Sequence, residues 1–267
     1  MDLVISVGQM DVQFGNPNVN LTQVRRLAAE AARRGSDVLV LPELWSTGYD
    51  LSNAGRYAAR IDEGVFAATA VLAHKYGIHI VGSCLSVMGE GRYGNTAVLH
   101  DPSGNPLGAY SKAHLFGLMD EDKYLVGGNG RTLIETSWGK IGLAICYDLR
   151  FPELFRAYAL DGAKIIFLPA EWPYPRLAHW RTLLRARAIE NQMYIVACNR
   201  VGTADQTTFF GHSSIVDPWG DVVIEAGDTE MLLTATIDLD KVDEVRKQMP
   251  VLSDRRPQAY ACEEKEI

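Results

Sequence analysis

Cys146 is the residue of this chain best placed to act as a nucleophile. It follows the apolar run 140–145, which predicts a buried strand, and a helix is predicted over 151–162. A side chain at the end of a buried strand is held rigidly, and a nearby helix N-terminus favours a thiolate. Cys84 and Cys198 also lie in strand-like runs but lack this context, so we interpret them as small buried apolar residues.

A thiol needs a base, because free cysteine has a pKa of about 8.5. His114, His179 and His212 lie in predicted loops or helix starts, and composition does not choose among them. Glu43 is a rival base, since it ends a buried strand at LPE, where a carboxylate is costly without a role or a neighbouring cation. Lys112 ends another predicted strand, in AYSKAHLF.

The elements that must position these residues follow from the hydrophobic pattern. Strands are predicted over 3–9, 37–42, 78–87, 96–100, 106–112 and 140–145. Helices are predicted over 18–35, 63–77 and 151–162, each with glycine at its end. Residues 113–130 read as an irregular, glycine-rich loop. Consecutive strands at 78–112 and 213–238 favour a sandwich of two sheets, with helices on both outer faces, over a doubly wound sheet.

The second half of the chain echoes the first. DVLVLPE (37–43) has a counterpart in KIIFLPAE (164–171). The hairpin TAVLHDPSGN (96–105) has a counterpart in SSIVDPWGD (213–221). Two matched pairs in the same order predict two similar halves of one layered domain.

Composition restricts the partners and the compartment. Lys and Arg total 26 against 33 Asp and Glu, a net charge of −7, and clustered positive charge for nucleic acid or an anionic membrane is missing. The sequence shows neither a signal peptide nor an apolar stretch of membrane-spanning length. Four scattered cysteines predict no disulfide framework and no zinc site. We therefore expect a cytoplasmic protein with one domain over 1–267, in which 250–267 form a C-terminal arm.

Three segments together resemble the catalytic blocks of the nitrilase superfamily, also called the carbon–nitrogen hydrolases. They are LPELWSTGY (41–49), YSKAHLF (110–116) and LAICYDLRFPE (143–153), in the family's order and with comparable separations. Flanking segments such as 179–202 and 211–223 match too, so the resemblance covers nearly the whole chain. It implies an α/β fold, the four-layer α-β-β-α sandwich of two similar halves, and a homodimer or higher homo-oligomer formed through the outer helices.

The resemblance also implies roles for individual residues. Glu43 would be the general base, Lys112 the electrostatic partner and Cys146 the nucleophile that forms a thioester, with no metal and no organic cofactor. Glu121, in the sequence DEDKY, aligns with a second glutamate found in many members. The backbone N–H of Tyr147 is expected to stabilise the oxyanion.

Within the superfamily the chain most resembles the ω-amidase branch linked to bacterial methionine salvage, through PELWSTGYDL, HLFGLMDEDKYL and PAEWPYPRLAHW. This implies hydrolysis of the terminal amide of 2-oxo acid amides such as 2-oxoglutaramate. Such a substrate needs a cation for its carboxylate. Arg176, Arg181 and Arg200 are the candidates, whereas Arg150 is expected to pair with Glu153.

Not all of the other residues expected in the pocket suit an anionic substrate. Tyr49 and Trp172 are expected to wall the pocket. Glu171 would repel an anionic substrate, so we expect it to bind a substrate amine or to pair with Arg176. An N-carbamoyl amine or amino acid amidohydrolase is therefore the alternative enzyme. A non-catalytic scaffold on the same fold is the alternative from another class.

Overall fold

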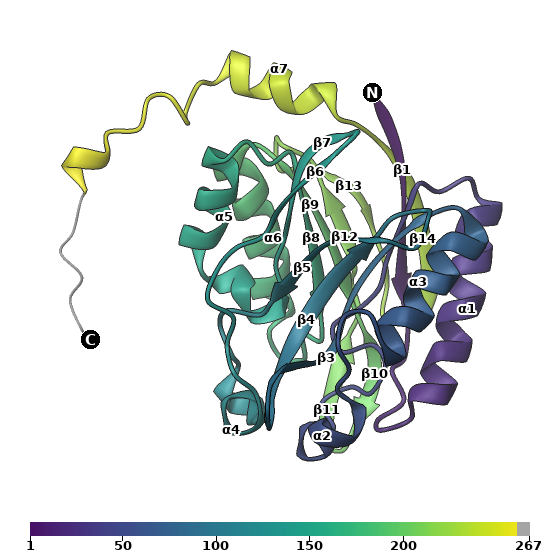
Figure 1. Ribbon diagram of the computed structural model, residues 1–267. Helices are drawn as coiled ribbons and strands as arrows, with labels where there is room; N and C mark the ends of the chain where they lie inside the picture. The colour runs from purple at the N-terminus through teal and green to yellow at the C-terminus, as the bar shows by residue number, and fades with distance from the viewer. Residues whose placement is uncertain (261–267) are drawn as a thin grey trace.

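The computed structural model describes residues 1–260, and two six-stranded sheets form its centre (Figure 1). The strands of the first sheet are β1 (Asp2–Gln9), β2 (Val38–Val40), β3 (His79–Gly89), β4 (Arg92–His100), β5 (Pro106–Ser111) and β14 (Met231–Asp238). Those of the second are β6 (Leu133–Thr136), β7 (Gly139–Leu143), β8 (Ile165–Ala170), β9 (Tyr194–Asn199), β12 (Ser214–Val216) and β13 (Val222–Glu225). A separate hairpin consists of β10 (Val201–Ala204) and β11 (Thr207–Phe210).

Helices cover the outer face of each sheet (Figure 1). On the first sheet these are α1 (Pro17–Arg33) and α3 (Gly64–Tyr76), and on the second α5 (Pro152–Leu160) and α6 (Leu177–Asn191). The remaining α-helices among the described residues are α2 (Ala54–Tyr57), α4 (Glu121–Tyr124) and α7 (Asp240–Gln248). The layers therefore run helix, sheet, sheet, helix, which confirms the predicted architecture.

The two sheets repeat one pattern of strand pairing. From β14 through β1, β2, β3 and β4 to β5 the pairings run antiparallel, parallel, parallel, antiparallel, antiparallel. From β6 through β7, β8, β9 and β12 to β13 they run in the same sequence. The predicted similarity of the halves is thus present in the topology, and it makes β2 and β8 equivalent strands.

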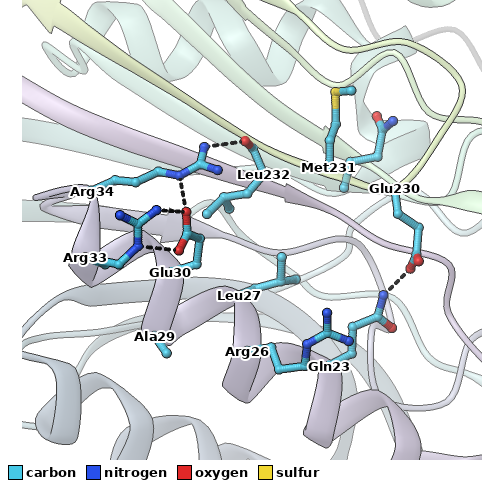
Figure 2. Close-up of a pocket in the computed structure, with 11 residues that line it drawn as sticks. Gln23, Arg26, Leu27, Ala29, Glu30, Arg33, Arg34, Glu230, Met231 and Leu232 are labelled. Atoms are coloured by element: carbon cyan, nitrogen blue, oxygen red, sulfur yellow. Dashed lines mark hydrogen bonds and ion pairs between the residues drawn. The ribbon is translucent and has the colours of Figure 1, made fainter.

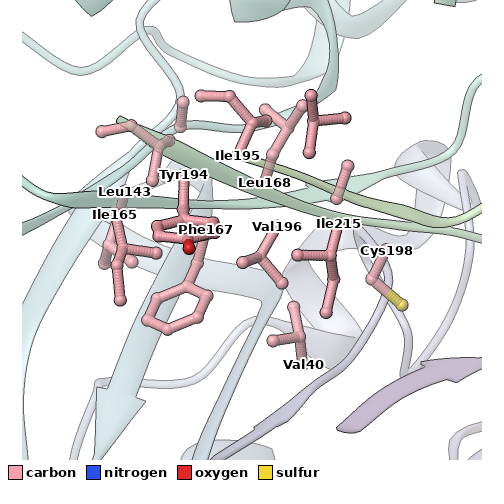
Figure 3. Packing of buried hydrophobic residues seen from close by; sticks show 14 of the residues in the cluster. Val40, Leu143, Ile165, Phe167, Leu168, Tyr194, Ile195, Val196, Cys198 and Ile215 are labelled. Atoms are coloured by element: carbon pink, nitrogen blue, oxygen red, sulfur yellow. The ribbon is translucent and has the colours of Figure 1, made fainter. Parts of the chain in front are cut away.

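The space between the sheets is filled by apolar side chains. Figure 3 shows Val40 of β2 in one cluster with Phe167 of β8 and Val196 of β9, all of them fully buried. On the other face of the first sheet, Leu39 packs in a second cluster with α1 and α3. Because successive residues of a strand point to opposite faces, β2 is buried on both sides. The residues that follow such a strand start from a rigid position.

The bounds of the predicted elements agree with the structure within a few residues. The segment 113–130 is not wholly irregular, because the single turn α4 lies within it. Beyond α7 the chain leaves the sandwich, as Figure 1 shows for residues 249–260. The end of the predicted arm, 261–267, lies outside the described residues, so its packing stays a prediction. Among residues 1–260, every helix is too short or too polar to cross a bilayer.

Candidate active site

The predicted chemical residues meet where several strands end. Glu43 lies just beyond β2, Lys112 directly follows β5, and Glu121 opens α4. Cys146 follows β7 and begins the short 3-10 helix η3 (Cys146–Arg150). Parallel neighbours such as β2 and β3 place their carboxyl ends at one edge, which is where open α/β sheets commonly carry sites. The fold thus brings together residues that are far apart in the sequence.

Lys112 is held between two carboxylates. Its Nζ donates to Glu43 Oε1 at 2.7 Å and to Glu121 Oε2 at 2.6 Å, and all three side chains are fully buried. Burial alone would lower the pKa of Lys112, but the charges of Glu121 and Glu43 outweigh it and raise the pKa. The lysine is therefore a permanent cation in the centre of the site.

Glu43 is fixed by four donors. Besides Lys112, its Oε1 accepts from the Tyr49 hydroxyl at 3.0 Å and from Asn95 Nδ2 at 2.8 Å. Its Oε2 accepts from the Glu171 N–H at 2.9 Å. These bonds leave the carboxylate a single orientation, within hydrogen-bonding reach of the Cys146 thiol.

Asn95 also connects the two glutamates, because its Nδ2 lies 3.0 Å from Glu121 Oε1. Sequence reasoning missed this residue. The available signal was an amide directly before TAVLH, in the same strand β4, where a buried polar side chain must find partners.

Cys146 adopts a backbone conformation that is rare for a residue with a side chain. Its φ is 45° and its side chain is only 4% exposed. A non-glycine residue in this region stores strain, which the surrounding structure must hold in place. The neighbouring Asp148 supplies part of that support, because its carboxylate accepts from the Ile145 N–H at 2.9 Å and from the Tyr110 hydroxyl at 2.8 Å.

The thiol of Cys146 is protonated at rest. Burial and the negative charge of Glu43 raise its pKa well above the ordinary value, and Lys112 offsets this only in part. The surroundings thus raise the pKa of the thiol, although a nearby helix N-terminus was expected to favour the thiolate. The thiol must instead give up its proton as it attacks, and Glu43 is the adjacent acceptor.

A small pocket opens onto the sulfur. It is lined by Phe116, Cys146, Tyr147, Arg150, Glu171, Trp172, Pro173 and Arg176. The predicted Trp172 and Arg176 thus line it, together with Arg150, which was not expected there. Tyr49 is not part of this lining and contacts Glu43 and Lys112 instead. Tyr147 lies in the first turn of η3, where helical N–H groups lack partners within their own helix.

Two predicted ion pairs differ from those observed. Arg150 does not pair with Glu153 among the described residues; it lies in η3, before α5 begins at Pro152. Its guanidinium lies 4.8 Å from the Trp172 ring centroid. Glu171 pairs with Arg200, at 3.2 Å, rather than with Arg176.

The remaining candidates for the carboxylate-binding residue and for the base lie outside this pocket. Arg181 pairs with Glu225 at 2.6 Å on the outer side of the second sheet. His114 contacts Asp148 at 2.7 Å, and His212 contacts Glu225 at 2.7 Å. His179 lies 3.4 Å from Arg150 and is solvent-exposed. The ring nitrogens of the three histidines are thus directed to partners other than Cys146.

A larger groove lies along α1 and β14 but has no comparable chemistry (Figure 2). Glu30 there accepts from both Arg33 and Arg34, and Arg34 also donates to the carbonyl of Leu232. These charged side chains pair with one another at the surface. None of the residues predicted to act in catalysis lines this groove.

Comparison with known proteins identifies the family of this chain. The sequence profile of the carbon-nitrogen hydrolase family matches residues 4–247. A 2-oxoglutaramate amidase of Bacillus subtilis (strain 168) is 42% identical, over 97% of this chain and 100% of its own. An ω-amidase of Mus musculus is 34% identical, over 92% of each chain.

A solved structure is similar as well. It is a glutamate-to-glutamine variant of an amidase from Nesterenkonia sp. AN1, with the acetamide moiety of fluoroacetamide added covalently to the active-site cysteine. It is 28% identical, has a TM-score of 0.86, and the match covers 97% of this chain and 95% of that one. The chain described here belongs to the carbon–nitrogen hydrolase family, the nitrilase superfamily. It is an enzyme of that family, with amidases among its relatives.

We predict that Lys112→Met lowers the free energy of unfolding by about 3–5 kcal/mol, because it leaves two buried carboxylates without their shared cation. Urea denaturation followed by circular dichroism measures the change. The double variant Lys112→Met/Glu121→Gln should recover part of the loss, since only one uncompensated charge then remains. A Lys112→Met protein as stable as the wild type would contradict the charge balance described above.

Proposed function

We propose that the protein is an ω-amidase that hydrolyses the terminal amide of a 2-oxo acid amide such as 2-oxoglutaramate to the acid and ammonia. One observation carries the proposal. A thiol, a carboxylate and a permanent ammonium from distant segments meet beside one pocket. The printed activity of the Bacillus and mouse relatives supports the choice of substrate.

In the first half of the proposed reaction, the Cys146 sulfur attacks the amide carbon while its proton passes to Glu43. The carbonyl oxygen becomes an oxyanion, which the Lys112 ammonium and the Tyr147 N–H stabilise. One such donor typically contributes about 3–4 kcal/mol. Glu43 then returns the proton to the nitrogen, because an amide nitrogen leaves readily only when protonated. Ammonia departs and a thioester remains on Cys146.

In the second half, water replaces ammonia as the reacting partner. Glu43 takes a proton from the water as its oxygen attacks the thioester carbon. Collapse of this second tetrahedral intermediate breaks the carbon–sulfur bond and releases the carboxylic acid, and the proton on Glu43 restores the thiol. Glu121 contributes by holding Lys112 and by keeping it protonated in this scheme.

The pocket supplies cations for an anionic substrate. Arg176 lies over the Phe116 ring at 5.6 Å and Arg150 over the Trp172 ring at 4.8 Å. Neither guanidinium meets a carboxylate within salt-bridge distance among residues 1–260, whereas Arg181 and Arg200 both do. Aromatic faces orient guanidinium groups without neutralising them. We therefore propose that Arg176, assisted by Arg150, binds the substrate carboxylate.

The alternative carbamoyl hydrolase for cationic amines loses its main support. That reading depended on Glu171 as a free anion in the pocket, but its carboxylate is engaged by Arg200. The non-catalytic scaffold is disfavoured because all three chemical groups converge. N-carbamoyl substrates remain useful as controls.

We predict ammonia release from 2-oxoglutaramate and from succinamate, and little from N-carbamoylputrescine, N-carbamoyl-β-alanine or a simple nitrile. Cys146→Ser and Glu43→Gln should each lower kcat by at least about 10³-fold, because they remove the nucleophile and the base. Circular dichroism should show that both variants remain folded. Turnover of the carbamoyl compounds alone would reject the ω-amidase assignment, and full activity of Cys146→Ala would reject the mechanism.

A second prediction concerns the cation. Arg176→Gln should raise KM for 2-oxoglutaramate about 10- to 100-fold with a smaller effect on kcat, since a charge-assisted hydrogen bond contributes about 1.5–3 kcal/mol. Steady-state kinetics measure this change. Arg181→Gln is the matched control in α6 and should leave KM unchanged. Equal effects of the two variants would show that the pocket arginine has no special role.

We further propose that the protein is a homodimer joined through α5 and α6, and that it works in the cytoplasm. Ile189 of α6 is 49% exposed although it is a large apolar residue, and Leu160 at the end of α5 is 46% exposed. The family resemblance implies an interface through the outer helices, and these two side chains are apolar residues of α5 and α6 that would lie in it. For the compartment, Cys84, Cys146 and Cys198 are all unpaired thiols, as is usual in reducing surroundings.

Ile189→Glu is predicted to convert the dimer to a monomer, because it places a charge in the apolar interface. Sedimentation equilibrium measures the mass. Val71→Glu on α3, where the side chain is 64% exposed, is the matched control and should leave the dimer intact. A wild-type monomer at micromolar concentration would refute the proposal.

A further inference from the structure

Glu171 is a buried acid that the mechanism above does not use. It directly follows β8 and is only 1% exposed. Its main-chain N–H donates to Glu43 Oε2 and also faces the Cys146 sulfur. The backbone of this residue therefore contacts both the base and the nucleophile, and a shift of residue 171 would displace the two groups that exchange the proton.

The side chain of Glu171 is poorly provided with donors. Its Oε2 has one partner, Arg200 Nη1, at the long distance of 3.2 Å. Its Oε1 is buried without a hydrogen-bond partner and lies close to Gly48. By contrast Glu43 accepts from four donors, and Glu121 accepts from Lys112, Asn95 and the Phe116 N–H. A buried carboxylate with so few donors is costly to ionise.

Arg200 does not compensate fully, because it is shared. Its Nη2 also reaches Asp11 Oδ1 at 3.2 Å and the Val12 carbonyl at 2.7 Å. The charged and titratable groups that face Glu171 are Arg200, Glu43, Lys112, Tyr49, Cys146 and, through Arg200, Asp11.

The charge count of the buried site also indicates that one carboxyl group keeps its proton. Glu43, Glu121 and Glu171 are three buried acids against two buried cations, Lys112 and Arg200. Among these five groups, full ionisation would leave an excess negative charge, and the oxyanion of the reaction would add another. Arg150 and Arg176 line the same pocket but lie against aromatic rings, and neither is within salt-bridge distance of Glu171. Retaining one carboxyl proton removes the excess. The acid with the fewest donors is the one that keeps it.

We propose that Glu171 is a positioning residue of the hydrolysis reaction that works as the neutral acid, holding its N–H on Glu43 and Cys146 without adding a negative charge beside them. The proposal rests on the hydrolase mechanism given above. In this view the ionised form is inhibitory, because its charge opposes the oxyanion.

The pH range of the effect follows from the environment of the side chain. Burial raises the pKa of Glu171 to about 8, with Arg200 lowering it and Glu43 raising it again. The group is thus neutral below this value and ionised above it. Lys112 and Cys146 both have raised pKa values, so they do not titrate in the same range. Burial also raises the pKa of Glu121, so a fall in activity above neutral pH reports Glu171 only where it is lost in Glu171→Gln.

The test is Glu171→Gln, which copies the shape and charge of the neutral acid. The wild-type kcat/KM for 2-oxoglutaramate should fall about tenfold per pH unit above the pKa of Glu171. The Glu171→Gln variant should match the wild type within about threefold at pH 7 and should lose this fall between pH 8 and pH 9. An unchanged alkaline fall in Glu171→Gln would overturn the proposal. So would a folded variant that is inactive at every pH, because the ionised carboxylate would then be required.

Asp11→Asn provides a second variant in case Glu171→Gln does not fold. Removing the competing carboxylate leaves Arg200 to Glu171 alone, which lowers the pKa of Glu171, so the alkaline fall should move to lower pH. No movement would count against the proposal.

Infrared difference spectra give a readout that needs no substrate. The C=O stretch of a protonated carboxyl should disappear between pH 7 and pH 9 in the wild type and be absent from Glu171→Gln. Its loss without any ammonia release would place the failure in the proposed substrate, not in Glu171.

Discussion

The arrangement of the candidate active site depends on the buried contact of one ammonium with two carboxylates. Taking Lys112 out of water costs several kcal/mol, and the same is true of Glu43 and Glu121. Only their mutual contacts at 2.6–2.7 Å, with the further donors Tyr49 and Asn95, make the arrangement tolerable. Each group therefore has a fixed place, and the reaction can use charges that need no reorganisation when the oxyanion forms.

The fold of this chain was predictable from local patterns, whereas the connections within the site were not. Strand ends at Glu43, Lys112 and Cys146 could be located because apolar runs stop there. Their convergence depends on strand order, which hydrophobic periodicity does not encode, and it was expected only through resemblance to a family. Asn95 was missed because its two partners lie on other segments. Arg150 was assigned to Glu153 from the local sequence RFPE, which does not show that its guanidinium lies against the Trp172 ring.

The internal repeat explains why two glutamates face each other. Glu43 follows β2 and Glu171 follows β8, and these strands occupy the same place in the two halves. The sandwich brings their carboxyl ends together, so the N–H of one glutamate binds the carboxylate of the other. Their ion-pair partners differ, because Glu43 contacts Lys112, whereas Glu171 contacts Arg200, which is shared with Asp11. The ends of two equivalent strands thus place glutamates in different electrostatic surroundings.

The protonated state of Cys146 has a consequence beyond hydrolysis. Peroxides attack thiolates far faster than thiols, and sulfenic acid formation follows thiolate character and exposure. A thiol that is 4% exposed, with a raised pKa, offers neither. We therefore expect the resting enzyme to resist oxidants that inactivate thiolate enzymes, and its sulfur to become vulnerable only while a substrate draws the proton away.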